Sequence, residues 1–293
     1  MALRFDLQSH STHSDGALPA ATVVQRAAQA GVELLALTDH DTVSGVSEAL
    51  TAGEQHGLRV VPAIEISALD QHAAPARELH ILGYSIDHRS PLLTDALTGF
   101  LADREQRTLR MAAALEELGL ELDRDDIARR RAAGQPIGRP HLAEAVLTCS
   151  ANATRLQAEG IDDVGSLIRG YLVEGRPAFR LRQTPTVEEA IDAIHAAGGL
   201  AVWAHPFWDI SDEVEVLATV ERFRALAIDG VEAFYVTHTR HQTELLAERC
   251  LALDLLTTGS TDFHGPENRQ FSRFLGFHTY GLQPNLGPIA SGS

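Results

Sequence analysis

The chain has 293 residues, 44% hydrophobic and 22% charged, which is enough for a large buried core in a globular protein. A net charge of −16 argues against long RNA or DNA as a partner, because basic surfaces hold such polyanions. The two cysteines form no CxxC pair and no signal-like or membrane-spanning apolar run occurs, so we expect a cytoplasmic protein without disulfides, zinc–thiolate site or membrane span.

Short apolar runs alternate with helical stretches along most of the chain. This alternation predicts right-handed crossovers and a mostly parallel sheet, and seven units favour an α/β barrel over an open sheet. Seven runs bounded by Gly, Pro or polar residues predict the strands Arg4–Leu7, Leu34–Thr38, Val60–Ile64, Leu79–Tyr84, Leu200–Ala204, Gly230–Phe234 and Leu255–Thr258. Helices are expected at Pro19–Ala30, Thr42–His56, Val187–Ala197 and Asp212–Leu226, and the first three end at a glycine.

Residues 87–183 interrupt this alternation, because they carry helical patterns and no convincing strand. The helices expected there are Leu92–Leu118, Asp125–Ala133, His141–Ala158 and a stretch containing Leu167–Leu172. We therefore expect a barrel made of residues 1–86 and 184–285, with residues 87–183 as a helical insertion that caps its active-site face. Residues 286–293 form a tail, and the Gly-, Pro- and Ser-rich segment after Leu282 is expected to be frayed.

Histidines and acidic residues gather where the predicted strands end or within them. They are His10, Asp15, His40, Glu65, His80, His205, Asp262 and His264. The carboxyl ends of barrel strands meet at one face, so these side chains can converge although they are far apart in sequence. Imidazoles and carboxylates without thiolates suit Mn, Fe, Zn or Mg, and so many groups indicate two or three ions, two of them bridged by Glu65. Such a cluster supports phosphoester hydrolysis, because metals lower the pKa of a bound water towards about 7 and clamp phosphoryl oxygens.

Each of these residues also has a purely structural interpretation. Asp39 can cap the helix that begins near Thr42, Asp15 can be a turn residue before Gly16, and any single buried histidine can be a hydrogen-bonded core residue. The structural interpretation must, however, explain a histidine or an acid at nearly every strand end at once. The metal cluster explains all of them together.

The motifs that carry these residues resemble those of the PHP (polymerase and histidinol phosphatase) family, and in particular its stand-alone phosphoesterases. The matching segments are DLQSHSTHSDG, LTDHDT, AIEIS, ELHILGY, AHP and GSTDFHG. The resemblance implies a distorted (β/α)7 barrel with a helical insertion and up to three metal sites. Carried over by position, the sites are His10, Glu65 and Asp262 with Gln8; Glu65, His80 and His205; and Asp15, His40 and His264. The catalytic set implied by the resemblance is Asp15, His40, His205, Asp262 and His264.

The chain departs from the family pattern at Gln8, where the family usually has the first histidine of an HxH pair. A neutral amide oxygen is a poorer ligand than imidazole for these metals, and His13 lies in a loop and is not expected to replace it. We therefore expect two firmly bound divalent metals and a weak or absent third. Manganese is the first choice, with Fe, Zn and Mg as alternatives.

Substrate-side residues are expected in the segment Ile137-Gly138-Arg139-Pro140-His141, a turn that opens a helix. The resemblance implies that this segment faces the active site. Arg139 suits a non-scissile phosphate, because a guanidinium group matches the geometry of phosphate oxygens and helix N-termini bind anions. His141 is expected beside it. Arg139 can equally be a surface residue. His238 is expected to line the barrel mouth, and Phe179, Arg180 and Phe207 are weaker candidates. Arg129–Arg131 are expected to form a solvated face that pairs with Asp123, Asp125 and Asp126.

The resemblance implies that the substrate is a small nucleotide, from which the enzyme removes the 3′-phosphate of a 3′,5′-nucleoside bisphosphate with a metal-activated hydroxide. The alternatives are a 5′–3′ exoribonuclease on short RNA, a histidinol-phosphate phosphatase, and a non-catalytic module that binds metal or nucleotide. No membrane and no protein partner are expected.

Overall fold

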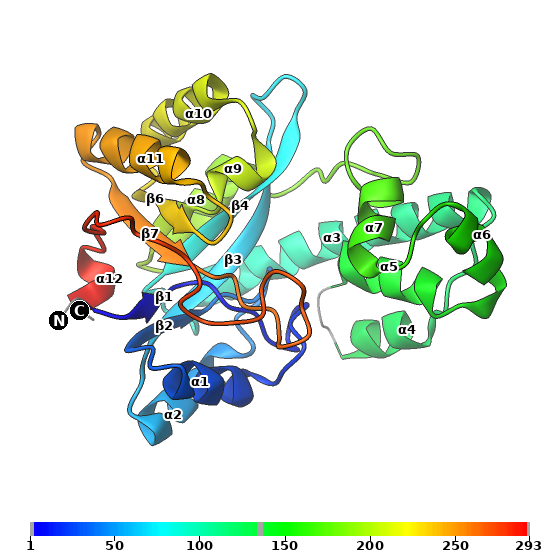
Figure 1. Ribbon diagram of the computed structural model, residues 1–293, viewed down its shortest axis with the longest axis horizontal. Coiled ribbons are helices and arrows are strands. Elements are labelled where there is room, and N and C mark those ends of the chain that lie inside the picture. The colour runs from blue at the N-terminus through cyan, green and yellow to red at the C-terminus, as the bar shows by residue number, and fades with distance from the viewer. Residues whose placement is uncertain (1–2, 134–136, 292–293) are drawn as a thin grey trace.

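The computed structural model describes residues 3–133 and 137–291 and contains one seven-stranded sheet in the order β1 to β7. Residues 134–136 of the insertion and 292–293 of the tail lie outside the described residues. The sheet curls into a nearly closed barrel (Figure 1), which confirms the predicted α/β barrel fold. The strands are β1 (Phe5–Asp6), β2 (Leu34–Leu37), β3 (Arg59–Asp70), β4 (Arg77–Tyr84), β5 (Leu200–Trp203), β6 (Gly230–Tyr235) and β7 (Leu256–Ser260).

The first and last strands meet along the seam of the barrel. The Leu7 amide donates to the carbonyl of Gly259 at 3.1 Å, and the His10 amide donates to the carbonyl of Phe263 at 2.8 Å. The two segments that follow β1 and β7 therefore run side by side, because Ser9 and Phe263 form a parallel bridge. This seam brings the first and last motifs of the sequence into contact.

Strand β4 is antiparallel to both of its neighbours, whereas all other pairs are parallel. Only residues 71–76 separate β3 from β4, too few for the crossover of a dozen or more residues that a parallel pair needs. The two strands therefore form a long hairpin, and β3 extends well beyond the predicted Val60–Ile64. Glu65 consequently lies inside β3, and the expectation that it follows the strand was wrong.

Helices cover the outer face of the barrel. Thr186 and Glu189 form a capping box on α8, and Thr239 and Gln242 form another on α11; neither was predicted, although this signal is local. Asp212 caps α10 by accepting from the amide of Glu215. The helices are α1 (Ala20–Gln29), α2 (Val46–His56), α8 (Val187–Ala196), α9 (Pro206–Asp209), α10 (Glu213–Ala225) and α11 (Arg240–Ala252).

The segment between β4 and α8 is helical and projects from one side of the barrel (Figure 1). It has its own hydrophobic core, which includes Met111, Leu142 and Leu172. The predicted helix His141–Ala158 is broken after Leu147, because the Asn152 side chain donates to the carbonyl of Val146 and ends the first helix. The elements are α3 (Pro91–Glu117), α4 (Asp125–Ala132), α5 (Arg139–Leu147), η1 (Ser150–Asn152), α6 (Ala153–Ala158), α7 (Val164–Leu167) and η2 (Ile168–Leu172).

The C-terminal segment packs against the barrel, so the expectation of a frayed tail was wrong for the residues described. The Thr257 amide donates to the carbonyl of Asn285, and Leu286 and Ile289 are buried with Phe5 and Leu34. The short helix α12 (Pro288–Ser291) follows. Within residues 3–133 and 137–291, no helix is both long and apolar enough to cross a membrane.

Candidate metal centre

The seam and the hairpin bring the motif residues together at one mouth of the barrel. His10 follows β1, His40 follows β2, His205 follows β5, and Asp262 and His264 follow β7. These are carboxyl ends of strands, where active-site residues of α/β barrels lie. Glu65 and His80 reach the same place from inside β3 and β4. The bridge between His40 and Glu65 fixes the end of β2 against β3.

Three residues at the strand ends have left-handed backbones, namely Asp41 (φ 54°), His205 (φ 31°) and Asp262 (φ 54°). Side chains other than glycine rarely adopt this region, and such strain concentrates at functional sites. At His205 the left-handed residue ends the run of β5 and begins α9. The strain thus turns the chain sharply and keeps the imidazole at the barrel mouth.

The first group consists of His10, Glu65 and Asp262, all buried. Nε2 of His10 lies 3.1 Å from Oε2 of Glu65 and 3.0 Å from Oδ1 of Asp262. Among the described residues, His10 Nε2 and Asp262 Oδ1 have no partner with hydrogen-bond geometry. Buried polar atoms rarely lack a hydrogen-bond partner. Two such atoms that lie close together therefore fit a site where both would bind one cation.

The second group consists of Glu65, His80 and His205. Oε1 of Glu65 lies 2.6 Å from Nδ1 of His80 and 3.3 Å from Nε2 of His205, and the two nitrogen atoms are 3.3 Å apart. His40 joins Glu65 and His80 in an overlapping group. The two oxygens of Glu65 therefore face different imidazoles, as a carboxylate that bridges two ions must.

The third group consists of Asp15, His40 and His264, which His10 completes. Oδ2 of Asp15 lies 3.7 Å from Nε2 of His40, and Oδ1 lies 3.5 Å from Nε2 of His264. The rings of His10 and His264 stack with their centroids 4.3 Å apart. All eight histidines and acids expected from the sequence thus lie in one contiguous cluster.

Gln8 is fully buried beside the first group, but its amide takes part in hydrogen bonds. Nε2 of Gln8 donates to Oε2 of Glu65 at 2.9 Å, and Oε1 accepts from the Ser260 hydroxyl at 3.3 Å. That hydroxyl also lies 2.7 Å from a carboxylate oxygen of Glu232. Gln8 therefore holds the central carboxylate in place from the position where the family has a histidine.

The protonation states of the three carboxylates and of His40 suit cation binding. Burial raises the pKa of Asp262, but His264 and His10 outweigh it and bring the pKa to about 2. Burial also raises the pKa of Glu65. The charges of His40 and His80 outweigh this effect and hold the pKa well below its usual range. Burial lowers the pKa of His40 to about 3 against the attraction of Glu65 and Asp15. Ionised carboxylates and neutral imidazole are the forms that bind divalent metals.

His10 and His205 differ from His40. Burial lowers their pKa values, but Asp262 acts on His10, Asp209 acts on His205, and Glu65 acts on both, which raises each pKa well above its usual range. In the metal-free protein, protons on these two rings balance the charge of the neighbouring carboxylates. A bound cation would take over this role. Metal uptake at this cluster is therefore expected to release protons.

Asp39 binds the loop between His10 and Asp15, and it does not cap a helix as the structural interpretation of this residue proposed. Its carboxylate accepts hydrogen bonds from the Ser11 amide, the Ser11 hydroxyl and the Ser14 hydroxyl, each at 2.7 Å. Helix α2 begins instead after Gly45. Gly16 closes the same loop, because a Cβ there would lie 2.2 Å from the carbonyl oxygen of His10. The loop between His10 and Asp15 is thus rigidly held.

The insertion approaches the cluster through the N-terminus of α5. His141 is buried, and its Nδ1 accepts from the Gly138 amide at 3.0 Å. Burial and the charge of Arg130 lower its pKa to about 4, although the charge of Asp15 opposes the change. Burial raises the pKa of Glu78, but the charges of Arg139 and Arg107 lower it overall. His141 thus lies within reach of the Asp15 charge, and half-exposed Arg139 within reach of the Glu78 charge.

His238 and Phe179, which were also proposed for the substrate side, pack against neighbouring side chains. The His238 ring is buried between Phe207 and Tyr235, and Nδ1 lies 3.2 Å from the Ala233 carbonyl. Phe179 lies under the guanidinium of Arg107, at 5.6 Å.

Arg130 also differs from expectation. It pairs with Asp126 as predicted, but it is mostly buried and donates to the Ser14 carbonyl at 3.0 Å. Helix α4 is thereby attached to the candidate metal-binding loop.

A buried ionic network at the base of the insertion was missed. Arg104 from α3 lies 2.6 Å, and Arg182 from the returning chain 3.2 Å, from the same Oδ2 of Asp41. The Arg182 side chain is 1% exposed and that of Asp41 is not exposed. Because the three residues come from segments distant in sequence, no local signal reveals the network.

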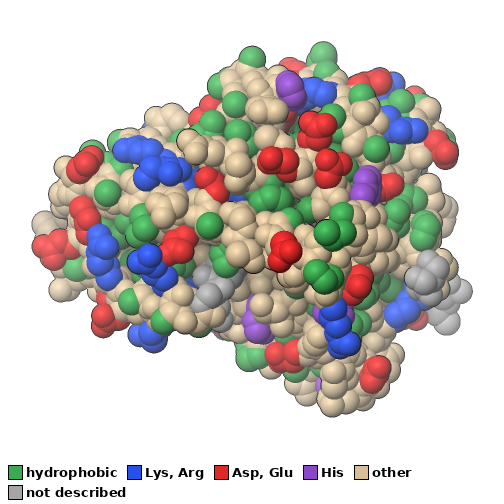
Figure 2. Space-filling model, turned by 180° about the vertical axis from the view of Figure 1, so that it is seen from behind, with side chains coloured by type: hydrophobic (Ala, Val, Ile, Leu, Met, Phe, Trp, Pro, Cys, Tyr) green, Lys and Arg blue, Asp and Glu red, His purple; other side chains and the backbone are tan. Residues whose placement is uncertain are grey.

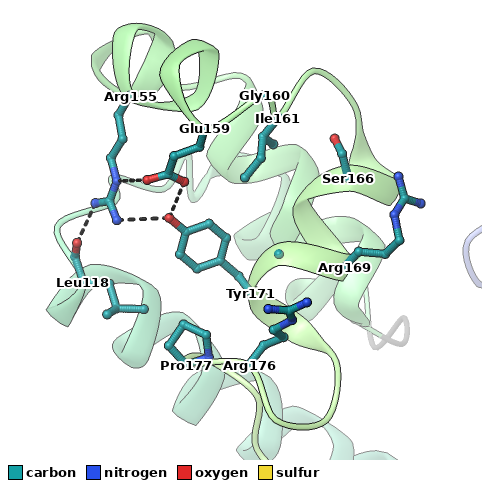
Figure 3. Close-up of a pocket in the computed structure, with 11 residues that line it drawn as sticks. Leu118, Arg155, Glu159, Gly160, Ile161, Ser166, Arg169, Tyr171, Arg176 and Pro177 are labelled. Carbon is teal, nitrogen blue, oxygen red and sulfur yellow. Dashed lines mark hydrogen bonds and ion pairs between the residues drawn. The ribbon is translucent and has the colours of Figure 1, made fainter.

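An open cavity of about 520 Å³ lies within the insertion (Figure 3) and is separate from the cluster. Arg155 lines it, but its donors already bind the Leu118 carbonyl, Glu159 and the Tyr171 hydroxyl. Its lining residues include no histidine. The cavity therefore offers no site comparable with the metal centre.

Comparison with known proteins identifies the class. A model of the PHP domain matches residues 6–125. A 5′-3′ exoribonuclease of Haemophilus influenzae is 33% identical over 91% of this chain and 92% of its own. A 3′,5′-nucleoside bisphosphate phosphatase of Chromobacterium violaceum is 31% identical over 97% and 94%. A solved amidohydrolase from the same organism, with bound sulfate, has a TM-score of 0.82 at 28% identity and covers 99% of this chain and 95% of its own.

The barrel and its cluster of carboxylates and imidazoles define a metal-dependent phosphoesterase. The chain belongs to the PHP family, as its motifs predicted.

Proposed function

We propose that the protein removes the 3′-phosphate from 3′,5′-nucleoside bisphosphates, such as adenosine 3′,5′-bisphosphate. The observation that carries this proposal is the convergence of four imidazoles, from His10, His40, His80 and His205, on the two oxygens of Glu65. A pocket with several adjacent cation sites suits the dense charge of a terminal phosphate. The bisphosphate phosphatase that is 31% identical over 97% of this chain supports the choice of substrate.

Each group has a distinct part in the proposed reaction. Divalent ions, with manganese the first choice, supply charge neutralisation of the phosphoryl oxygens and a lowered pKa of water when bound. His10, Glu65 and Asp262, then Glu65, His80 and His205, then Asp15, His40 and His264 would hold them. Arg139 binds the phosphate that is not cleaved. Neutral His141, beside it, supplies a hydrogen bond without adding charge.

The test is phosphate release from adenosine 3′,5′-bisphosphate in the presence of Mn²⁺. We expect faster release than from AMP or from p-nitrophenyl phosphate, and a higher KM in Arg139→Ala. Equal rates on the bisphosphate and the simple monoesters would contradict the proposed selectivity. His205→Ala is expected to retain its circular dichroism spectrum and lose activity.

A second candidate is 5′–3′ exonucleolytic cleavage of short RNA, which the 33% identical Haemophilus influenzae exoribonuclease favours. On the face shown in Figure 2, basic side chains lie among acidic ones, and such a face suits short substrates better than a long polyanion. A 5′-phosphorylated oligonucleotide of four residues distinguishes the two candidates. A ladder of mononucleotides identifies the exonuclease, whereas an intact chain supports the phosphatase.

A further inference from the structure

Trp208 is an exposed aromatic residue beside the candidate metal centre. It is 52% exposed, whereas Trp203, five positions earlier, is fully buried in the core. Trp208 lies on α9, the short helix that starts at the left-handed His205, and its amide donates to the His205 carbonyl at 2.8 Å. The strained turn that places His205 in the cluster therefore also places this indole ring near it.

Phe271 connects Trp208 to the cluster. The rings of Trp208 and Phe271 meet edge to face with centroids 5.6 Å apart, and Phe271 lies 5.6 Å from the His264 ring. The His264 amide donates to the Phe271 carbonyl at 2.9 Å, which holds the two residues together. Two steps of 5.6 Å thus lead from a candidate metal ligand to a solvent-exposed indole.

This arrangement is unlike the other aromatic contacts around the site. The Tyr235 ring is buried, and its hydroxyl donates to Asp262 at 2.8 Å, which is a supporting role. The Trp208 ring leaves half of its surface in water, and such surface is stabilised when a flat apolar group covers it. A nucleotide carries its base on C1′ of the ribose and its phosphates on C3′ or C5′, so a phosphate at the metal centre leaves the base free to reach an adjoining aromatic ring.

We propose that Trp208 and Phe271 form the nucleobase subsite of this enzyme. The proposal rests on the proposed function, and it specifies that recognition of the base occurs by stacking. Every base has a π-face, so stacking tolerates all bases and favours the larger purines. The enzyme therefore accepts adenine and guanine nucleotides in preference to those of uracil and cytosine.

The experiment measures the affinity of the full-length, Mn²⁺-supplied protein for AMP and for ribose 5-phosphate by calorimetry. AMP carries a base and ribose 5-phosphate does not. We expect Trp208→Ala to weaken AMP binding roughly 5- to 150-fold, the range found for loss of one stacking partner, and to leave ribose 5-phosphate within twofold. Trp208→Phe is expected to retain AMP binding within about threefold. UMP is expected to bind more weakly than AMP to the unchanged protein.

Leu251→Ala is the matched control, because Leu251 is a large apolar side chain that is 84% exposed and lies on α11. It is expected to change neither affinity. Equal weakening of AMP and ribose 5-phosphate in Trp208→Ala, unchanged AMP affinity, or no AMP binding to the starting protein would each overturn the proposal. A lower oligomeric mass of Trp208→Ala in sedimentation, without loss of AMP affinity, would assign Trp208 to a contact between copies of the chain instead.

The result separates this inference from the proposed function. If the protein releases no phosphate from nucleoside bisphosphates but loses AMP affinity selectively in Trp208→Ala, the phosphatase assignment fails and the subsite stands. If it is an active bisphosphatase whose KM is the same in Trp208→Ala, the subsite fails and the phosphatase assignment stands.

Discussion

At the scale of single residues, the central question is how Gln8 serves a site where the family has histidine. Its amide lies between Glu65 and Ser260, and both of its polar atoms are hydrogen bonded. We therefore propose that Gln8 positions Glu65 and leaves the first metal site with His10, Glu65 and Asp262. A site with one fewer imidazole is weaker for Mn²⁺, Fe²⁺ or Zn²⁺.

The variant Gln8→His is expected to increase the number of tightly bound metal ions from two to three per chain. The reason is that imidazole replaces an amide next to two buried carboxylates. Metal analysis after gel filtration measures the stoichiometry, with Ser260→Ala as the control that disturbs the same network without adding a ligand. Three tight ions in the unchanged protein, or two in Gln8→His, would contradict the assignment.

His141 makes stability depend on pH. Its folded-state pKa of about 4 lies below the unfolded value of about 6.5, so the unfolded state takes up the proton first as pH falls. Its favourable contribution is therefore present above pH 6.5 and is lost progressively down to about pH 4. Between pH 7.5 and 5.0 we expect the protein to lose about 2 kcal/mol more of its unfolding free energy than His141→Asn does. Urea unfolding at the two pH values measures this difference, and parallel losses would refute it.

At the scale of elements, the insertion is attached to the barrel by charge as well as by chain continuity. Arg104 on α3 and Arg182 in the segment that leads back to the barrel share the carboxylate of Asp41, in the loop after β2. Burial raises the pKa of Asp41, but the two guanidinium groups lower it far below its usual range. Nε of Arg104 also donates to the Ile137 carbonyl at 3.1 Å, just before α5, so this network also helps to position Arg139 and His141, the candidate substrate-side residues.

Removing one member of this network should lower the free energy of unfolding, because a buried charge is left incompletely paired. Arg104→Met is expected to destabilise the protein by about 3 kcal/mol and to raise the KM for the bisphosphate. Chemical unfolding and steady-state kinetics measure the two effects. The control is Arg124→Ala, whose exposed pair with Glu116 should contribute less than about 1 kcal/mol. Similar losses of unfolding free energy in both variants would show that the buried network stabilises the protein no more than an exposed ion pair does.

At the scale of the whole molecule, the barrel concentrates carboxylates in its interior. The net charge of −16 adds to the self-repulsion that bound cations would relieve. The opposite end of the barrel is closed by the C-terminal segment, where Leu286 and Ile289 cover Phe5 and Leu34. Stability should therefore depend on both ends, through metal at one and apolar burial at the other.

Metal removal is expected to lower the melting temperature. At a metal concentration one hundred times Kd, binding to the folded state adds about 2.7 kcal/mol, which corresponds to roughly 5–10 °C for a chain of this size. Thermal melts of chelator-treated protein with and without Mn²⁺ measure the shift, and Na⁺ at equal ionic strength is the control. An equal effect of Na⁺ would show ionic screening instead of specific binding.

The C-terminal closure predicts that Ile289→Ala destabilises the barrel by about 2–4 kcal/mol, because Ile289 is 1% exposed and its truncation leaves a cavity. Urea unfolding measures the change. Leu251→Ala, at a position 84% exposed, is expected to stay within about 0.5 kcal/mol of the starting protein. If the tail contributed nothing, the two variants would be indistinguishable.

Much of this protein is determined by short stretches of its sequence. Strand and helix periodicity, glycine stops and capping pairs are local, so most elements and the barrel class follow from them. The chemical types in DLQSHSTHSDG, LTDHDT and GSTDFHG are equally local, and they predicted a cluster that the fold assembles at one mouth.

The tertiary structure alone decided how these pieces are combined. It placed Glu65 inside a strand between four imidazoles and turned Gln8 towards that carboxylate. It also joined Arg104 and Arg182 at Asp41 and left Trp208 in solvent while Trp203 was buried. These outcomes depend on packing and electrostatics between segments tens to hundreds of residues apart, for which no local pattern in the sequence carries a signal.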